Sequence, residues 1–291
     1  MKSRKIRSII LPHRVRAKVR TLLYNIADTY KKSQNQEVFE IEGEKYIFYP
    51  STGTLVYPIP LCAPLSNMLV QAFKEGLRFP QIGTDESGKG DVFGPLVVAG
   101  AYVDKDDVPK LIEMGIKDSK RLGDDVIEEQ IEYIKKSLLY DVVLIKPKKY
   151  NELYAKMKNV NRILAWAHAR VIENILNKKE AHLVIIDMFA NPDFIKSYMF
   201  SKGRTMDFII ESQGERYLSS ALASIIARFY YIEHLKKMEK EYSISFPKGA
   251  GSNVNKAILE FIKTFGKDKL PYVAKMHFKN IKLHMSGQHS L

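Results

Sequence analysis

The chain has a single cysteine, Cys62, so it cannot close a disulfide within itself, and thiol redox and zinc-thiolate chemistry are excluded. No apolar run is long enough to cross a membrane. The short amino-terminal run at residues 9–11 is followed by proline and more arginine rather than by the apolar core of a signal peptide. These absences predict a soluble protein in a reducing compartment, which we take to be the cytoplasm.

Acidic residues are also scarce in this chain. Against 46 Lys and Arg there are 33 Asp and Glu among 291 residues, which gives a formal net charge of +13. The excess is concentrated in residues 1–36, where ten basic side chains face one acidic side chain, Asp28, for a net charge of +9. Such a segment can be a solvated arm that only aids solubility, but it also attracts polyanions, and we expect nucleic acid as the partner.

The first part of the chain has the pattern of a small mixed module. Apolar residues recur at helical spacing from Val15 to Tyr30, with basic residues on the other faces, and predict an amphipathic helix. Three β-like runs at residues 38–41, 45–49 and 54–57 are separated by turn residues and predict an antiparallel meander. A short helix is expected at residues 67–74, and the domain boundary falls between residues 60 and 80.

After residue 78, apolar strand-like segments alternate with longer helical segments, which is typical of an α/β domain. The predicted strands are residues 81–84, 92–103, 141–145, 182–186 and 206–210. The predicted helices are residues 108–114, 125–136, 149–156, 160–177, 193–199, a long helix from about 216 to about 242, and 256–265. Further on, the lysines of residues 275–282 fit a basic contact and an exposed helix equally well.

The most informative motif is Thr-Asp-Glu-Ser-Gly-Lys-Gly-Asp at residues 84–91. It places two adjacent carboxylates, Asp85 and Glu86, beside a flexible cationic turn at the end of a predicted strand. Carboxylate oxygens are suitable ligands for Mg²⁺, and glycines let backbone N–H groups approach a phosphate closely. The motif therefore predicts metal-assisted phosphodiester chemistry.

Three more acids stand at element ends. Asp187 follows the predicted strand 182–186, and in open α/β sheets ligands bind at the carboxyl ends of strands, although a lone aspartate there is commonly a helix cap. Glu211 and Glu215 flank the polar turn that precedes the long helix, where either acid can simply complement the helix dipole.

Together these motifs resemble the type 2 ribonucleases H. The resemblance rests on Asp-Glu-Ser-Gly-Lys-Gly at 85–90, Gly-Pro-Leu-Val-Val-Ala-Gly at 94–100, Asp-Ser-Lys at 118–120, Asp187, and Ala-Ser-Ile-Ile-Ala-Arg at 223–228. Lys89, residues 161–169 and the extra amino-terminal module are similar to ribonuclease HIII rather than ribonuclease HII. The resemblance covers roughly residues 80–280.

The resemblance implies an α/β (α+β) fold, in which a ribonuclease H-like mixed sheet is flanked by helices. It also implies a small amino-terminal helix-plus-antiparallel-sheet domain similar to the TATA-box-binding protein fold. We therefore predict a basic substrate-binding domain at residues 1–66, a linker or helix at 67–79, and the catalytic domain at 80–291.

The activity that the resemblance implies is endonucleolytic hydrolysis of the RNA strand of an RNA/DNA hybrid, which leaves 5′-phosphate and 3′-hydroxyl ends. Two divalent ions, Mg²⁺ or Mn²⁺, would be held by four carboxylates. Asp85, Glu86 and Asp187 match three of them. The family's fourth position falls on Gly214, and we choose the adjacent Glu215 over Glu211.

The resemblance also assigns the substrate contacts. The backbone of Gly88, Lys89 and Gly90 would read the 2′-hydroxyl that distinguishes RNA from DNA, and Lys89, Ser119 and Lys120 would hold phosphates nearby. We expect the hybrid duplex as the partner, no membrane, and a monomer.

Two other functions are compatible with parts of the sequence. A non-catalytic, basic nucleic-acid-binding protein would explain the charge but not three acids at element ends. A P-loop nucleotidase would fit Gly-x-x-x-x-Gly-Lys at residues 83–89, but Gly90 replaces the Ser or Thr that binds Mg²⁺, and a strand follows where a helix should begin.

Overall fold

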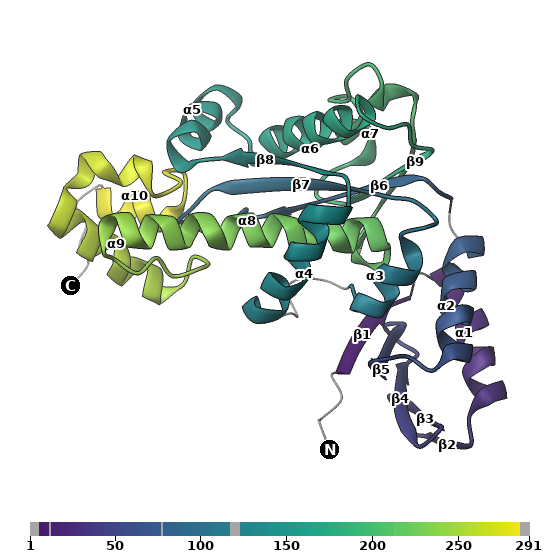
Figure 1. Cartoon of the computed structure of the whole chain (residues 1–291). Helices are drawn as coiled ribbons and strands as arrows, with labels where there is room; N and C mark the ends of the chain where they lie inside the picture. The colour runs from purple at the N-terminus through teal and green to yellow at the C-terminus, as the bar shows by residue number, and fades with distance from the viewer. Residues whose placement is uncertain (1–5, 12, 77, 117–122, 213, 286–291) are drawn as a thin grey trace.

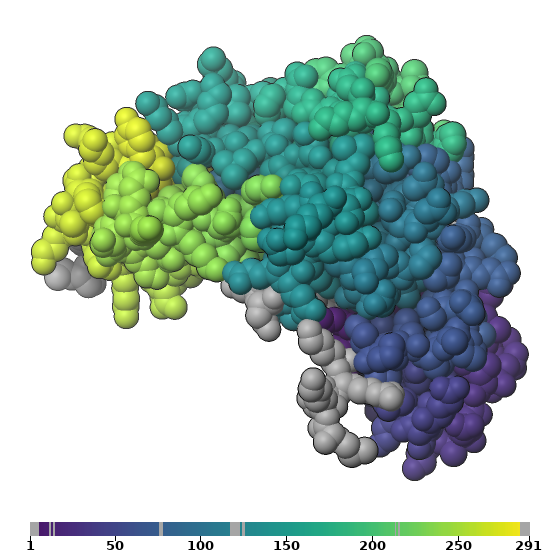
Figure 2. All heavy atoms as spheres, viewed as in Figure 1, coloured from purple at the N-terminus to yellow at the C-terminus, as the bar shows by residue number. Residues whose placement is uncertain are grey.

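The structure is a computed structural model that describes residues 6–11, 13–76, 78–116, 123–212 and 214–285. Figure 1 shows a larger unit built around one sheet, with a smaller unit at the amino-terminal end of the chain beside it. Figure 2 shows a broad concave side between the amino-terminal unit and the region of α9 (Ser252–Phe265).

The smaller unit is a five-stranded antiparallel sheet with two helices. Its strands have the order β1-β5-β4-β3-β2, and α1 packs against α2. The elements are β1 (Ile6–Ile10), α1 (His13–Ile26), β2 (Thr29–Lys32), β3 (Glu37–Ile41), β4 (Glu44–Tyr49), β5 (Thr54–Pro58) and α2 (Ala63–Gly76). Alternate residues of β3 are buried, because successive side chains of a strand point to opposite faces of the sheet.

The sequence pattern missed β1 and β2, the two edge strands of this sheet. β2 is exposed at all four positions and carries no apolar alternation, and β1 pairs with β5 across nearly fifty residues, with Ile6 opposite Pro58. Tyr30, assigned to the helix, lies in β2, which is a correction to the prediction. Helix α2 begins before residue 66 and ends at Gly76, so it spans the predicted boundary between the first domain and the linker.

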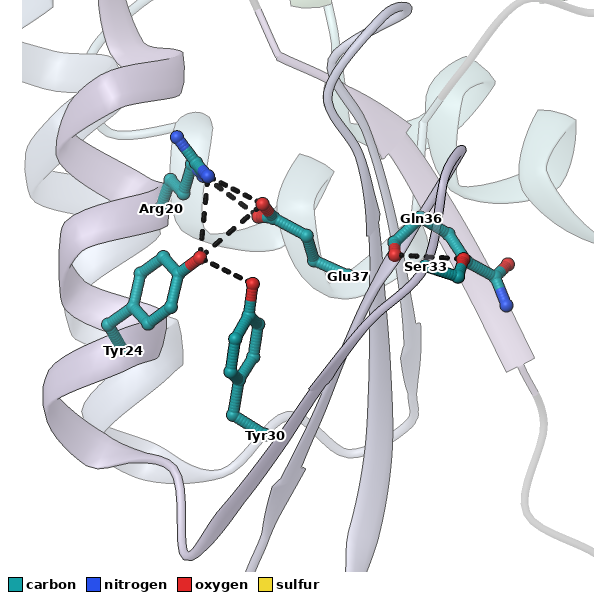
Figure 3. A network of polar contacts seen from close by, with 6 residues as sticks. All are labelled: Arg20, Tyr24, Tyr30, Ser33, Gln36 and Glu37. Carbon is teal, nitrogen blue, oxygen red and sulfur yellow. Dashed lines mark hydrogen bonds and ion pairs between the residues drawn. The ribbon is translucent and has the colours of Figure 1, made fainter.

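A buried ionic contact joins α1 to this sheet (Figure 3). The side chain of Glu37 is 1% exposed and accepts hydrogen bonds from Arg20 at 2.8 Å and 2.5 Å. The hydroxyl of Tyr24 lies 3.4 Å from the same carboxylate and donates to the hydroxyl of Tyr30 at 2.7 Å. The contact therefore fixes the basic helix against the edge of the sheet, in a geometry where the Glu37 carboxylate is fully paired.

The larger unit contains a mixed sheet with the strand order β10-β9-β6-β7-β8. Strands β6, β9 and β10 run parallel to one another, and β7 is antiparallel to both β6 and β8. The strands are β6 (Gln81–Ser87), β7 (Leu96–Val103), β8 (Tyr140–Ile145), β9 (Leu183–Asp187) and β10 (Asp207–Glu211). The predicted mixed sheet is confirmed, with the correction that β7 begins at Leu96 rather than at residue 92.

Helices cover both faces of this sheet (Figure 1). They are α3 (Val108–Met114), α4 (Asp124–Ser137), α5 (Pro147–Met157), α6 (Val160–Leu176), α7 (Pro192–Lys196), α8 (Leu218–Tyr242), α9 and α10 (Lys279–Met285), with the short 3-10 turns η2 (Gly203–Thr205), η3 (Gly214–Arg216) and η4 (Lys267–Tyr272). No described helix is long and apolar enough to span a membrane.

Two glycines let helices α8 and α6 approach the sheet closely. A Cβ atom at Gly83 would lie 2.1 Å from the backbone nitrogen of Ser220 in α8, and one at Gly100 would lie 2.3 Å from Val171 in α6. Backbone contact at Gly83 therefore sets how α8 lies against β6. This places the start of α8 next to the carboxyl end of β6.

Apolar clusters fill the space on both faces, one against α8 and the other against α6. The cluster on the α8 face continues into the amino-terminal unit. At the junction, the buried Tyr57 hydroxyl of β5 donates to the carbonyl of Ile112 in α3 at 2.7 Å. The two units thus share one continuous core.

Candidate active site

Two aspartates predicted from the sequence lie in one row at the carboxyl ends of β6 and β9. The strands are parallel, and their last register pair joins Thr84 to Ile186, so Asp85 and Asp187 are the next residues on adjacent strands. One strand further out, Glu211 is the register partner of Asp187. Residues in register on parallel strands point to the same face, so the row of three acids projects together.

The acids of this row face the start of α8. Asp85 pairs with Ala99, which belongs to the apolar cluster on the α8 face, and Gly83 on the same face of β6 touches the α8 backbone. Asp85 is 8% exposed, and its Oδ1 accepts a hydrogen bond from the Glu86 N–H at 2.7 Å. The main chain therefore holds the Asp85 carboxylate.

The turn before α8 is tied to Asp187. The N–H of Gly214 donates to Asp187 Oδ1 at 3.0 Å. A Cβ atom at Gly214 would lie only 3.1 Å from Asp187 Cα, so a side chain there would press on the strand. Glycine at position 214 therefore lets the turn lie close to β9. The backbone of Glu215 lies in η3, but its side chain lies outside the described residues, as do Ser119 and Lys120.

Glu86 points to the opposite face of β6, toward α6. Its Oε2 lies 3.4 Å from Nε2 of His168, and its Oε1 lies 3.5 Å from Nζ of Lys89. Burial alone would raise the pKa of Glu86, but His168 and Lys89 together outweigh burial and hold the pKa below its usual value. Glu86 is therefore ionised, with His168 beside one carboxylate oxygen and Lys89 beside the other.

His168 belongs to the predicted helix 160–177 and lies in the core beside Glu86. Its ring is 0% exposed, lies 2.8 Å from the Thr84 hydroxyl through Nδ1, and stacks on Phe189. A polar residue on the otherwise apolar face of the helix was the signal that could have found it. His168 thus links two residues of β6 that share one face.

The predicted turn Gly88-Lys89-Gly90 borders an open hollow of about 440 Å³. Its lining includes the cationic side chains of Lys89, Arg228 and Lys248, together with Tyr231. Of these cations only Lys89 was predicted. The others could not be told from exposed lysines and arginines, because α8 and residue 248 reach the turn only in the folded chain. The carboxylates of Glu86 and Asp91 also line the hollow, so its cationic side chains exceed its acidic ones by one.

The structure argues against the P-loop alternative. Residues 83–87 form part of a strand, and the element that follows the turn is strand β7 rather than a helix. A P-loop cradles its phosphates at a helix N-terminus, and this segment does not supply one.

The carboxylates fit a hard divalent cation by their chemistry. Asp85 and Asp187 offer oxygen ligands from adjacent strands, and Glu86 is already ionised. Among the described side chains, no three acidic, histidine or cysteine residues come close enough together to hold an ion. The backbone of Glu215 follows Gly214, whose N–H is bonded to the Asp187 carboxylate.

Comparison with known proteins identifies the family of this chain. The sequence model described as Ribonuclease HII matches residues 82–281. The Ribonuclease HIII of Protochlamydia amoebophila is 40% identical over 202 residues, which are 69% of this chain and 67% of the relative. The Ribonuclease HIII of Chlamydia pneumoniae is 39% identical over 212 residues, which are 72% of this chain and 71% of the relative.

Solved structures agree in fold. The RNase H3 of Aquifex aeolicus has a TM-score of 0.58 at 26% identity and covers 94% of this chain and 100% of its own. Bst-RNase HIII in complex with Mn²⁺ has a TM-score of 0.70 at 23% identity and covers 97% and 98%. The predicted fold, a ribonuclease H-like sheet preceded by a domain of the TATA-box-binding protein type, is confirmed. The chain therefore belongs to the ribonuclease HIII family.

Proposed function

We propose that this protein is an endoribonuclease that hydrolyses the RNA strand of RNA/DNA hybrids with the help of divalent metal ions. The observation that carries the proposal is the position of Asp85 and Asp187 side by side at adjacent strand ends, facing the start of α8. Membership of the ribonuclease HIII family supports the same reaction.

Asp85, Glu86, Asp187 and Glu215 are the residues that would hold two Mg²⁺ or Mn²⁺ ions. Bound ions of this kind activate water and neutralise the charge that develops on the phosphate. A protein that shares this fold has been solved with Mn²⁺. Asp85, Asp187 and Glu215 would act as ligands, and Glu86 would act as a ligand or orient water or the ribose hydroxyl. The products carry 5′-phosphate and 3′-hydroxyl ends.

The backbone of Gly88, Lys89 and Gly90 reads the substrate. Gly88 has φ +88°, and a Cβ atom there would lie 2.2 Å from the carbonyl oxygen of Pro95, so the turn is tight. A Cβ atom at Gly90 would meet no described heavy atom within 4 Å, which leaves its backbone open to a ligand. Such a backbone can approach the 2′-hydroxyl closely. Ser119 and Lys120 hold phosphates nearby.

The amino-terminal domain contacts the backbone of the hybrid. Its edge strand β2 presents Lys31 and Lys32 as exposed cations. Contacts to phosphate supply affinity without sequence preference. The protein acts as a cytoplasmic monomer.

Cleavage mapping tests this function directly. The wild-type protein is incubated with an RNA/DNA hybrid, a DNA duplex that contains one ribonucleotide, and a DNA duplex, each with Mg²⁺, Mn²⁺ or chelator. We expect metal-dependent cuts in the RNA strand of the hybrid and no cuts in the plain DNA duplex. Hybrid binding without any cleavage would instead indicate a non-catalytic binder. The single-ribonucleotide duplex defines the substrate range.

A further inference from the structure

Lys275 is a charged side chain in the interior of the protein. Its side chain is 0% exposed, in the segment between η4 and α10. The sequence pattern grouped it with the exposed Lys279 and Lys282, and for Lys275 this was wrong. An ammonium ion in the interior is costly unless polar groups surround it, and burial lowers the pKa of Lys275 to about 7. The groups around the ammonium indicate what the charge does.

The ammonium of Lys275 donates to backbone carbonyl groups of one short segment, residues 91–94. The acceptors are Asp91 O at 2.9 Å, Gly94 O at 2.8 Å and, more weakly, Phe93 O at 3.5 Å. The main chain reinforces this contact, because the N–H of Lys275 donates to Val92 O at 2.8 Å. Residues 91–94 are thus bonded along their length to one lysine.

The segment that carries Lys275 is itself anchored. The side-chain amide of Asn151 in α5 donates to the carbonyls of Pro271 and Ala274 at 3.1 Å and 2.9 Å. Its oxygen accepts from the N–H of Met276 at 2.9 Å. Lys275 therefore extends from a fixed base, and its hold on residues 91–94 does not depend on a loose loop.

Residues 91–95 form one compact unit with the Gly88-Lys89-Gly90 turn. The N–H of Asp91 donates to Gly88 O at 3.4 Å, and Gly88 lies against the carbonyl of Pro95. A displacement of the carbonyls of residues 91–94 therefore displaces the turn. Without the ammonium of Lys275, the carbonyls of Asp91 and Gly94 would lose their side-chain donor, while Phe93 O would keep the Tyr231 hydroxyl at 3.3 Å, and the segment would have to rearrange.

We propose that Lys275 is a positioning residue for the Gly88-Lys89-Gly90 turn. Its hydrogen bonds hold the carbonyls of residues 91–94 in place, and this fixes the position and orientation of the backbone of the turn. Lys275 does not touch the substrate in this arrangement. The inference rests on the proposed function, which assigns the turn to substrate recognition.

The test compares Lys275→Met, Lys275→Gln and the matched control Lys279→Met, whose side chain is exposed in the same region. Methionine keeps the volume but has no donor, and glutamine keeps two N–H donors without the charge. For Lys275→Met we expect hydrogen–deuterium exchange of residues 88–94 and KM for the hybrid to rise about tenfold, the equivalent of one lost hydrogen bond. Its kcat should stay within about threefold of wild type. In Lys275→Gln, both the exchange of residues 88–94 and KM should lie between those of wild type and Lys275→Met.

The proposal is overturned if Lys275→Met matches Lys279→Met in exchange and in KM, or if its exchange rises uniformly over the whole sheet. Should Lys275→Met fail to fold, Lys275→Gln decides by the same two measurements against the same control. The exchange experiment needs no substrate. A wild-type protein that does not cleave hybrids would therefore count against the proposed function. Faster exchange of Lys275→Met confined to residues 88–94 would still support the positioning role of Lys275.

Discussion

Glu211 is the register partner of Asp187, and both lie in the row that begins with Asp85. Neighbouring strands are about 4.8 Å apart, so Glu211 lies roughly 10 Å from Asp85 across two strands. Glu211 is therefore one strand further from Asp85 than Asp187 is. Glu215, in contrast, follows Gly214, whose N–H is bonded to the Asp187 carboxylate.

The fourth carboxylate can be identified by paired substitutions. We expect Glu215→Gln to lower kcat by at least about 100-fold, because loss of a ligand should exceed the 10–100-fold cost of losing an outer-shell partner. Glu211→Gln should lower kcat by less than about tenfold. Steady-state cleavage of a hybrid with saturating Mg²⁺ and Mn²⁺ measures both variants. The reverse order of effects would assign the role to Glu211.

Asp85→Asn should abolish metal-dependent cleavage, by at least about 100-fold in kcat, while the Kd for the hybrid stays within about threefold. The amide keeps the shape of the side chain but removes the anionic oxygen that a hard cation requires. Cleavage assays and binding by fluorescence anisotropy check the two quantities. Asp104→Asn, an acid near the other end of the sheet, is the control. Equal activity of the two variants would contradict the assignment.

Neutralising Lys31 and Lys32 together as glutamines should weaken hybrid binding and reduce the slope of log K against log salt by about 1 to 2. The physical reason is the loss of counterion release at phosphates near β2. The control replaces Lys105 and Lys178, which are exposed near the opposite end of the main sheet from the acids. A salt slope identical for both double variants would remove β2 from the interface.

The stability contributed at Lys275 should depend on pH. The folded pKa of about 7 lies below the unfolded value of 10.5, so the unfolded chain binds more protons between these values and stability rises with pH across that window. Relative to Lys275→Met, the wild type should gain about 2–3 kcal/mol in free energy of unfolding between pH 7 and 9. Urea titrations at both pH values measure this difference.

The groups that face Lys275 do not titrate in the same window. Burial and the neighbouring lysines lower the pKa of His277 to about 4, burial raises the pKa of Tyr150, and the carboxylate of Asp91 favours the charged lysine. A difference between wild type and Lys275→Met that stays constant from pH 7 to 9 would show that the lysine keeps its proton throughout.

Arg20→Met should lower the free energy of unfolding by about 2–3 kcal/mol, because it leaves the carboxylate of Glu37 buried and without its cation (Figure 3). Lys18→Met is the matched control on the same helix. Its ion pair with Glu75 is half exposed at both ends, and its loss should change the stability by about 0.5 kcal/mol or less. Equal changes in the free energy of unfolding for the two variants, measured by urea denaturation, would mean that the Glu37 carboxylate becomes hydrated when Arg20 is replaced.

The sequence predicted those parts of the fold whose signal is local. Strand β9 and the helices α3 and α6 were found at nearly their observed bounds, because apolar periodicity marks them directly, whereas β6 was predicted to end at residue 84 and extends to Ser87. The edge strand β1 was missed because its pairing with β5 comes from a distant part of the chain. A short polar edge strand such as β2 has no apolar pattern of its own.

The candidate site likewise contains residues that the sequence predicted and residues that it did not. Asp85, Glu86 and Asp187 stand at strand ends that the sequence marks, and the register brings Asp85 and Asp187 together. His168 and Lys275 were not predicted in their observed roles, because a charged or polar residue in a sequence gives no sign of which buried group it will meet. Their partners, Glu86 and residues 91–94, lie 82 or more positions away in the chain.

The shared core at Tyr57 and Ile112 has a practical consequence for protein engineering. The Tyr57 hydroxyl of the amino-terminal unit is hydrogen-bonded inside the larger unit, and the two units share apolar core. Removal of the smaller unit would therefore expose buried surface of the larger one. A chimaera that grafts the smaller unit onto another nuclease would have to bring α3 along, or supply an equivalent acceptor and apolar surface at the seam.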